Sequence, residues 1–438
     1  MSGRDRPRVT ARTLALDVLG CCLGPDAVPA EEAFAAHPGR ALLPSRDRAF
    51  ARLLIATVLR RLGQLDAVLA TFWRQRPRRQ RTLDALRLGA AQLLLLGTPA
   101  HAALAETVGC AAAPDRGMVN AILRRIADQG PALLAAQDAA VVNTPGWLFA
   151  AWCEAYGEAR ARAIARAHLD PPPLDLAARD DPAALAARTG GTPLAGRIVR
   201  LAGSHVVEEL PGYDDGLFWV QDVAASLPAR LLGDVRGRRV LDLCAAPGGK
   251  TAQLAASGAR VTAIEADPRR CRRLADNLAR LRLGAELIEA DVLSLTPDRL
   301  GPVDRILLDA PCTATGTIRR HPDIAWHKRA YDVVRLARRQ HELLDHAAAL
   351  LRPGGLLVYA VCSLQPEEGE PIIERVLAAR HDLVRSPVTA DELADLGLMP
   401  TVSGAVRTFP FDLEEKGGMD GFFIARLQRV ASAAEGSA

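Results

Sequence analysis

A strand–turn–helix pattern between residues 240 and 256 constrains this chain more than any other feature. The apolar run Val240-Leu-Asp-Leu243 leads into the turn Cys244-Ala-Ala-Pro-Gly-Gly-Lys250, and a helical pattern starts at Thr251. Strand-like and helical segments then alternate. The further strands are expected at residues 260–264, 286–289, 305–308, 356–361 and 422–426. This alternation is typical of a doubly wound parallel sheet, so we expect an α/β domain in the second half of the chain.

The first ~135 residues carry only helical periodicity. Apolar residues recur at helical spacing from Thr10 to Leu23 and in four later segments, and Ser45 is expected to cap the helix that starts there. Short mixed segments follow from about Asn143 to Gly237. We therefore predict an all-α domain (1–138), a small α+β linker domain (139–236), an α/β domain (237–430) and a disordered tail (431–438).

Composition excludes several classes of protein. No stretch approaches the 18 or more apolar residues of a membrane span, and no signal-peptide pattern follows Met1. Eight cysteines in 438 residues are too few for a disulfide scaffold, and their spacing does not resemble a zinc site. We expect a monomeric cytoplasmic protein without a metal. The net charge is only +4, but arginines cluster at residues 74–81. Such a cluster can neutralise phosphates, and the alternative is a solvated arginine face.

The turn at residues 244–250 is expected to hold a cofactor. A P-loop requires glycine where Cys244 stands, and the GxGxxG spacing is also absent. A nucleoside cofactor without phosphates fits better, which favours S-adenosylmethionine. Glu265 ends the next strand, where a carboxylate can bind ribose hydroxyls, with Asp267 as a competing choice. Asp291 is expected near the adenine; alternatively, each of these acids is a helix N-cap.

Two cysteines follow predicted strands. Cys312 ends the run Arg305-Ile-Leu-Leu-Asp-Ala-Pro-Cys312, and Cys362 comes directly after Leu356-Leu-Val-Tyr-Ala-Val361. A thiolate that adds to C6 of cytosine makes C5 nucleophilic towards a methyl donor, so this is covalent catalysis. Asp309 is expected to supply an acid beside the cytosine ring. The alternative is that both cysteines are buried, inert thiols. If they do take part in the reaction, the residues alone leave the roles of the two cysteines interchangeable.

At these motifs the chain resembles the Sun (Fmu/RsmB-type) family of RNA cytosine-C5 methyltransferases. The matching segments lie within residues 205–430 and include Cys244–Lys250, Asp309–Cys312, Tyr359–Ser363 with Pro366-Glu-Glu, and Gly418-Met-Asp-Gly-Phe-Phe. The resemblance implies a Rossmann-like S-adenosylmethionine-dependent domain. It makes Cys362 the nucleophile and Cys312 the group that assists proton loss and release. The implied cofactor site comprises Cys244, Ala245, Ala246, Pro247, Gly248, Gly249, Lys250, Glu265, Asp291 and Asp309.

The resemblance further implies that Asp309 hydrogen-bonds the cytosine ring and that Lys250 points towards the active site. The front half resembles the NusB RNA-binding helical domain, a combination similar to bacterial 16S rRNA methyltransferases. The same chemistry on tRNA and a non-catalytic rRNA-binding assembly factor remain alternatives. Arg319, Arg320 and His321 are expected to face RNA, with a solvated loop as the alternative. The chain departs from the family at Val361, where threonine is common, and in the linker at residues 172–179.

Overall fold

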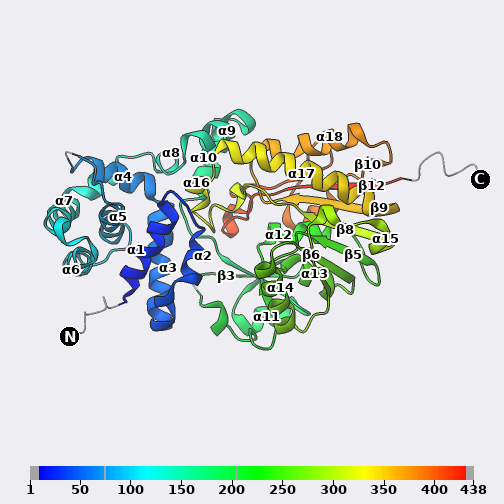
Figure 1. The fold of residues 1–438 in the computed structure, drawn as a ribbon, viewed down its shortest axis with the longest axis horizontal. Coiled ribbons are helices and arrows are strands. Elements are labelled where there is room, and N and C mark those ends of the chain that lie inside the picture. The colour runs from blue at the N-terminus through cyan, green and yellow to red at the C-terminus, as the bar shows by residue number, and fades with distance from the viewer. Residues whose placement is uncertain (1–8, 74, 204, 431–438) are drawn as a thin grey trace, which may run out of the picture. The chain divides into compact units, whose positions relative to one another are not determined.

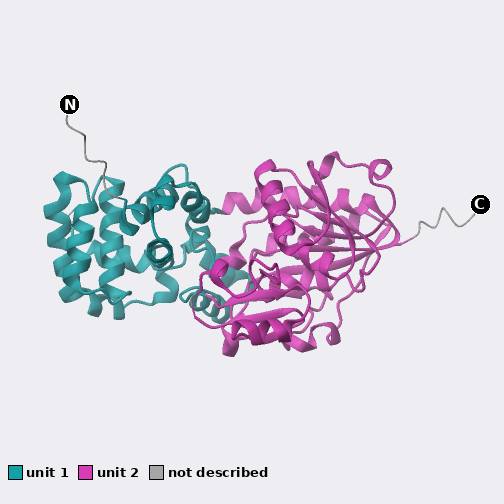
Figure 2. Ribbon diagram, turned by 90° about the horizontal axis from the view of Figure 1, so that it is seen from below, with its two compact units in different colours: residues 1–171, 318–329 teal, residues 172–317, 330–438 magenta. Residues whose placement is uncertain are grey.

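The computed structural model describes residues 9–73, 75–203 and 205–430 and divides the chain into two compact units (Figure 2). The helical unit is Met1–Pro171 with Ile318–Arg329, and the sheet unit is Pro172–Thr317 with Ala330–Ala438. The predicted tail at 431–438 lies outside the described residues. The division into three domains stays a prediction from the sequence.

The helical unit contains helices and no strand among its described residues. Its core includes leucines that repeat along the amphipathic helices, such as Leu14, Leu54, Leu65 and Leu86, all 0% exposed. Its helices are α1 (Ala11–Leu23), α2 (Ala30–Ala36), α3 (Ser45–Arg60), α4 (Leu62–Ala70), α5 (Gln80–Leu94), α6 (Ala100–Cys110), α7 (Arg116–Ala135), α8 (Ala139–Val142), α9 (Gly146–Tyr156), α10 (Glu158–Ala167) and α16 (Ile324–His327). The prediction that Ser45 caps its helix is wrong, because α3 begins at Ser45 and Pro44 occupies the cap position.

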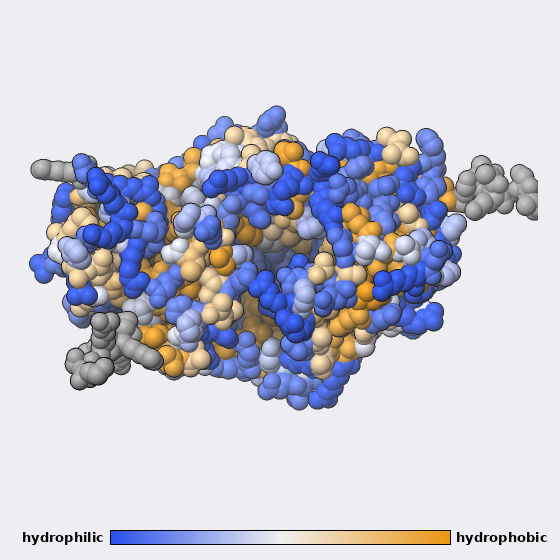
Figure 3. Space-filling model, in the orientation of Figure 1, coloured by the Kyte–Doolittle hydropathy of each residue, from blue (hydrophilic) through white to orange (hydrophobic). Residues whose placement is uncertain are grey.

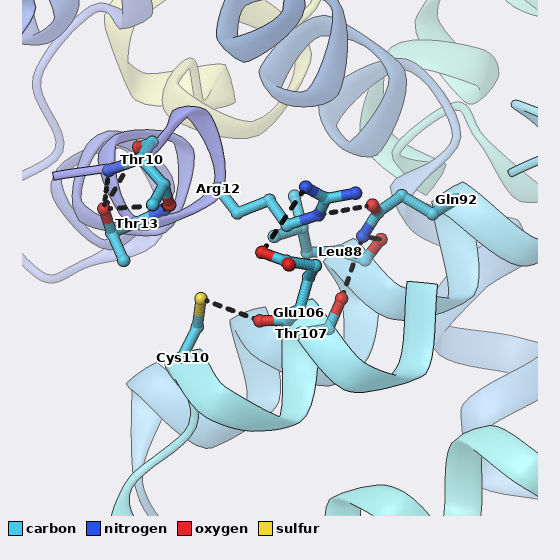
Figure 4. A network of polar contacts seen from close by, with 8 residues as sticks. All are labelled: Thr10, Arg12, Thr13, Leu88, Gln92, Glu106, Thr107 and Cys110. Carbon is cyan, nitrogen blue, oxygen red and sulfur yellow. Dashed lines mark hydrogen bonds and ion pairs between the residues drawn. The ribbon is translucent and has the colours of Figure 1, made fainter. Parts of the chain in front are cut away.

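A buried amide links three of these helices (Figure 4). Gln92 of α5 accepts a hydrogen bond from Arg12 Nε of α1 at 2.8 Å and donates to Thr107 Oγ1 of α6 at 2.9 Å. Its Nε2 also donates to the Leu88 carbonyl at 3.1 Å. A buried amide must find partners for its donors and acceptor, so this set of contacts fixes how α1, α5 and α6 pack.

A segment from far along the chain completes the helical unit. In residues 318–329, Trp326 Nε1 donates to the Leu59 carbonyl at 2.8 Å, and Asp323 accepts from the backbone N–H of Ala30 at 3.1 Å. Arg60 donates to the carbonyl of Arg319 at 2.7 Å. The Arg319 side chain is only 2% exposed, so the expectation that it faces RNA is wrong. The Arg319 side chain does not face outwards because these hydrogen bonds anchor its segment among the helices, where it is buried.

The sheet unit starts with a small antiparallel sheet of order β2-β3-β1-β4. Its strands are β1 (Leu174–Ala178), β2 (Thr192–Ala195), β3 (Ile198–Leu201) and β4 (Phe218–Val220), with α11 (Pro182–Thr189) between β1 and β2. From β4 the chain enters α12 (Val223–Arg230), whose N-cap Asp222 accepts from Ala224 N at 2.8 Å. The segment predicted as a strand entering a helix at Leu217–Asp222 therefore has that form.

The large sheet has the order β10-β12-β9-β8-β5-β6-β7, and β11 pairs with β12. Strands β5 to β9 are parallel, as the sequence predicts, whereas β10, β11 and β12 pair antiparallel. The strands are β5 (Arg239–Leu243), β6 (Arg260–Glu265), β7 (Glu286–Glu289), β8 (Val303–Asp309), β9 (Leu351–Val361), β10 (Leu383–Arg385), β11 (Val406–Arg407) and β12 (Phe423–Arg429).

Helices cover both faces of this sheet (Figure 1). Side chains alternate between the faces along each strand, so Val240 packs with α12, α13 (Gly249–Ala256) and α14 (Pro268–Leu281), while Leu241 packs with α17 (Ala330–Leu350) and α18 (Glu370–Ala379). The short helix α15 (Pro297–Leu300) precedes β8. This layered arrangement is Rossmann-like and places the loops after β5, β6, β8 and β9 at one edge of the sheet.

The described helices include none that is long and apolar enough to span a membrane. The face drawn in Figure 3 is largely hydrophilic, with hydrophobic residues interspersed among the polar ones.

Candidate active site

The loop after β5 is a tight backbone cradle that leads into α13. Cys244 has φ 61° and Gly248 has φ 103°, a left-handed conformation that favours glycine. A Cβ at Gly248 would lie 2.3 Å from Leu274 Cδ1, so a larger residue there would also have to displace the Leu274 side chain. Two side chains of α14 hydrogen-bond to the loop. Arg270 donates to the Ala246 carbonyl at 2.7 Å, and Asn277 donates to the Pro247 carbonyl at 2.8 Å.

Glu265, at the end of β6, faces this loop. Its buried carboxylate accepts from the backbone N–H groups of Ala246 (3.2 Å), Ala266 (3.0 Å) and Asp267 (3.1 Å). Asp267, the competing choice, instead caps α14 by accepting from Arg269 N at 2.7 Å. Of these two carboxylates, therefore, only Glu265 is directed at the loop, and Asp267 caps α14.

Asp291 lies two residues beyond β7 and is exposed. Both of its carboxylate oxygens accept from Arg339 Nη2 at 2.8 Å, and Oδ1 also caps a short 3₁₀ turn through Leu293 N at 3.0 Å. These contacts lower the pKa of Asp291, with the Leu293 N–H as the largest favourable contribution. The capping alternative therefore describes Asp291 in this structure, and its role towards adenine stays a prediction.

The two cysteines lie side by side. Strands β8 and β9 are parallel neighbours in register, with Asp309 opposite Ala360, so the residues after each strand emerge at the same edge. Cys312 Sγ and Cys362 Sγ are 3.5 Å apart. All eight cysteines of the chain are free thiols. Two sulfurs at this distance can exchange a proton or act on one small substrate.

Lys250 and Asp309 form an ion pair beside the thiols. Lys250, the second residue of α13, places its Nζ 2.7 Å from Asp309 Oδ2 and 5.5 Å from the centre of the Phe422 ring. Burial by itself lowers the pKa of this ammonium, but the charge of Asp309 and its hydrogen bond outweigh burial and raise it. Lys250 is therefore a stable cation near Cys362, and it is the only cation in the loop 244–250.

Two thiols of the site have raised pKa values. The hydrogen bond with Cys362 and then burial raise the pKa of Cys312 well above its ordinary value. Burial likewise raises the pKa of Cys244 to about 12. Cys244 and Cys312 thus remain protonated at neutral pH.

A buried carboxylate behind the thiols escaped the sequence analysis. Glu368, in the 3₁₀ turn Pro366–Glu368, is 0% exposed and accepts hydrogen bonds from Thr313 and Ser363, the residues that directly follow the two cysteines. The Pro366-Glu-Glu segment was a visible signal, but only the fold brings Thr313 and Glu368 together.

The cradle fits a nucleoside cofactor. Its glycine admits close backbone approach, Glu265 offers a carboxylate to ribose hydroxyls, and the sole loop cation is engaged by Asp309 instead of being free for phosphate. Among the described residues no group of three or more His, Cys, Asp or Glu side chains is arranged to hold a metal ion.

Two family descriptions match the chain. Residues 229–428 match the family described as 16S rRNA methyltransferase RsmB/F, and residues 9–128 match the NusB family. A protein from Pseudomonas putida named ribosomal RNA small subunit methyltransferase B is 39% identical over 413 residues, covering 88% of this chain and 92% of that protein. One of the same name from Klebsiella pneumoniae is 40% identical over 364 residues, covering 77% and 83%.

Solved structures share the fold. The crystal structure of PH0851 covers 97% of this chain and 100% of its own, with a TM-score of 0.75 and 20% identity. The structure of NSun6 from Pyrococcus horikoshii with SFG covers 66% of this chain and 99% of its own, with a TM-score of 0.58 and 20% identity. With identity near 39% over most of its length to the curated relatives, this chain belongs to the RsmB/F family of RNA methyltransferases and carries a NusB-family domain in its first half.

Proposed function

We propose that this protein transfers a methyl group from S-adenosylmethionine to C5 of a cytosine in 16S rRNA. The observation that carries the proposal is the 3.5 Å thiol pair at the ends of β8 and β9, beside the Lys250–Asp309 ion pair. The names of the relatives support ribosomal RNA as the substrate. Action as a monomer in the cytoplasm belongs to the same proposal.

Cys362 is the nucleophile of this reaction. Its sulfur adds to C6 of the cytosine, and the electron pair of the C5–C6 double bond moves to make C5 reactive. The Lys250 cation stabilises the thiolate before attack, because it lies close enough for the two charges to interact. Asp309 hydrogen-bonds the cytosine ring and fixes its position against both cysteines.

S-adenosylmethionine supplies the electrophilic methyl group when it is bound. The residues that would hold it are those of the cradle after β5 together with carboxylates at the following strand ends. They are Cys244, Ala245, Ala246, Pro247, Gly248, Gly249, Lys250, Glu265, Asp291 and Asp309. Glu265 would accept from the ribose hydroxyls, and the Gly248 backbone would approach the cofactor closely.

Cys312 serves the second half of the reaction. Its hydrogen bond with Cys362 is the largest cause of its raised pKa. Formation of the S–C6 bond removes that cause, so Cys312 can pass its own proton to solvent water and then, as a thiolate, accept the C5 proton. The C5–H electron pair then restores the C5–C6 double bond, and the Cys362 sulfur leaves as a thiolate.

Two cysteine variants test these roles. Cys362→Ala should abolish methylation of 16S rRNA transcripts, whereas Cys312→Ala should accumulate a covalent protein–RNA adduct that survives a denaturing gel. Cys153→Ala, in α9 of the helical unit, is the matched control and should keep wild-type turnover. Normal turnover by Cys362→Ala would remove it as the nucleophile.

The RNA target requires a separate experiment. Bisulfite sequencing of total RNA from a deletion strain should show the loss of one methylated cytosine in 16S rRNA. Loss at a tRNA position instead would redirect the proposal to tRNA. Calorimetry with S-adenosylmethionine separates the enzyme from a non-catalytic rRNA-binding factor, which would bind RNA without binding the cofactor.

A further inference from the structure

A single buried carboxylate connects the two segments that carry the cysteines. Glu368 Oε2 accepts from Thr313 Oγ1 and from Ser363 Oγ, each at 2.5 Å, and Oε1 accepts from Thr313 N at 2.9 Å. Thr313 follows Cys312 and Ser363 follows Cys362, so one side chain is hydrogen-bonded to the neighbour of each sulfur. Neither segment is regular secondary structure at this point, and such segments need side-chain contacts to hold one geometry.

Glu368 also accepts hydrogen bonds from Gln340 and Tyr359. Gln340 of α17 donates to Glu368 Oε1 at 2.9 Å, and the buried Tyr359 hydroxyl donates to the Glu368 carbonyl at 2.7 Å. Further bonds link the two segments directly, since Gly316 N donates to the Cys362 carbonyl at 3.0 Å and Leu364 N donates to Thr315 Oγ1 at 3.0 Å. Glu368 lies at the centre of this buried network, where a carboxylate accepts strong, directional hydrogen bonds.

Several donors converge on Glu368 and Ser363. The Thr313 and Ser363 hydroxyls each have one proton, and both oxygens lie within hydrogen-bond distance of the same Glu368 oxygen. The Ser363 oxygen accepts from Gln365 N at 3.0 Å and also lies 3.0 Å from Thr313 Oγ1 and 3.2 Å from Thr315 Oγ1. A glutamine in place of Glu368 has only one acceptor oxygen, so it cannot satisfy Thr313 N and both hydroxyls together.

We propose that Glu368 is a positioning residue that holds Cys312 and Cys362 at the spacing the methyl-transfer reaction needs. This inference rests on the proposed function, because the spacing matters only if both sulfurs act on one base. Glu368 lies behind the thiols, so it acts through Thr313 and Ser363 and does not touch the RNA. A misplacement of reacting groups by about 1 Å can cost about 10²-fold in rate.

Steady-state kinetics of Glu368→Gln provide the first test. We expect kcat to fall by roughly 10- to 100-fold, while KM for RNA and the Kd for S-adenosylmethionine stay within about twofold. Glu367→Gln is the matched control, because Glu367 is the adjacent, exposed glutamate and should keep wild-type kcat. If Glu368→Gln kept wild-type kcat, or lost cofactor binding in proportion to kcat, the positioning role would be overturned.

Oxidative cross-linking measures the spacing without any activity. Diamide removes two electrons and two protons from two adjacent thiols, which leaves a disulfide, and peptide mass spectrometry identifies the Cys312–Cys362 linkage. We expect the linkage to form several-fold more slowly in Glu368→Gln than in Glu367→Gln. An unchanged rate would overturn the inference even if kcat fell. This readout uses the free protein, so a failure of the proposed RNA activity would not affect it.

Milder variants keep the inference testable if Glu368→Gln does not fold. Thr313→Val and Ser363→Ala each remove one hydroxyl donor to Glu368 and leave the carboxylate in place. Each should lower kcat and slow the diamide cross-link less than Glu368→Gln. Wild-type values of both quantities in both variants would show that the carboxylate does not set the thiol spacing.

Discussion

At the scale of single residues, the site contains carboxylates in sharply different surroundings. Asp309 is paired with Lys250 at 2.7 Å, whereas Asp242 of β5 is fully buried and receives one side-chain hydrogen bond, from Thr251 Oγ1 at 2.6 Å. Its Oδ1 has no hydrogen-bond partner among the described residues. Burial, followed by the charge of Asp309, raises the pKa of Asp242 to about 7.

This raised pKa predicts how stability changes with pH. Between about pH 4 and pH 7 the unfolded chain has released the Asp242 proton while the folded protein retains it. The contribution of Asp242 to the free energy of unfolding therefore falls as pH rises through this window, by about 1 kcal/mol per pH unit, and is constant above it. Asp242→Asn does not titrate, so its stability relative to the wild type should increase from pH 5 to pH 7 in urea unfolding.

One result would contradict the raised pKa of Asp242. It is that the free energies of unfolding of Asp242→Asn and the wild type differ by the same amount at pH 5 and at pH 7. Asp298→Asn, at an exposed acid in the same unit, controls for the general effect of removing a negative charge.

The location of residues at the end of a strand could be predicted from one contiguous motif, because a strand followed by its loop is a local pattern. Cys244–Lys250, Cys312 and Cys362 are of this kind. Glu265 could be named but not separated from Asp267, since the choice depends on which acid caps α14. Glu368 and the Asp291–Arg339 ion pair could not be predicted, because their partners lie 55 and 48 residues away and only tertiary packing sets those distances.

At the scale of elements, the parallel strands β5 to β9 were predictable from their alternation with helices. The antiparallel pairing of β12 was not, because a closing apolar strand reads the same in either direction. The small sheet carries a buried ion pair that periodicity does not reveal. Asp175 of β1 and Arg200 of β3 form two hydrogen bonds of 2.7 Å and are 0% and 8% exposed.

That ion pair connects the small sheet to the segment before β12. Arg200 Nη1 donates to the carbonyls of Lys416 and Gly418 at 2.9 and 2.8 Å, and Val223 N donates to Asp175 at 3.1 Å. Asp175→Ala leaves the Arg200 cation buried without its carboxylate, so the free energy of unfolding should fall by about 3–5 kcal/mol in urea denaturation.

Two further variants make this prediction specific to burial. Asp215→Ala removes an exposed ion pair with Arg188 in the same unit and should cost under about 1 kcal/mol. Replacing Asp175 and Arg200 together by leucine and methionine removes both charges and should recover much of the loss. Equal destabilisation by Asp175→Ala and Asp215→Ala would contradict the account.

At the scale of the whole molecule, the chain enters the helical unit twice. The segment 318–329 begins six residues after Cys312, belongs to the helical unit, and returns to the sheet unit at Ala330. The chain therefore leaves the sheet unit shortly after Cys312 and is anchored among the helices of the helical unit before it returns. Sequence periodicity assigned this segment to the α/β domain, because its anchoring partners lie more than 250 residues earlier.

Trp326→Ala tests whether this anchoring matters for catalysis. The substitution removes the hydrogen bond to the Leu59 carbonyl and the packing of the indole against the helical core. We expect single-turnover methylation to slow by about 10-fold, because the Cys312 loop loses a fixed end, while the Kd for S-adenosylmethionine stays unchanged, since the cradle lies wholly in the sheet unit. Tyr331→Ala is the control, at an aromatic residue 73% exposed just beyond the segment. If Trp326→Ala lowered the melting temperature but left the single-turnover rate at the wild-type value, the segment would contribute only to the fold of the helical unit.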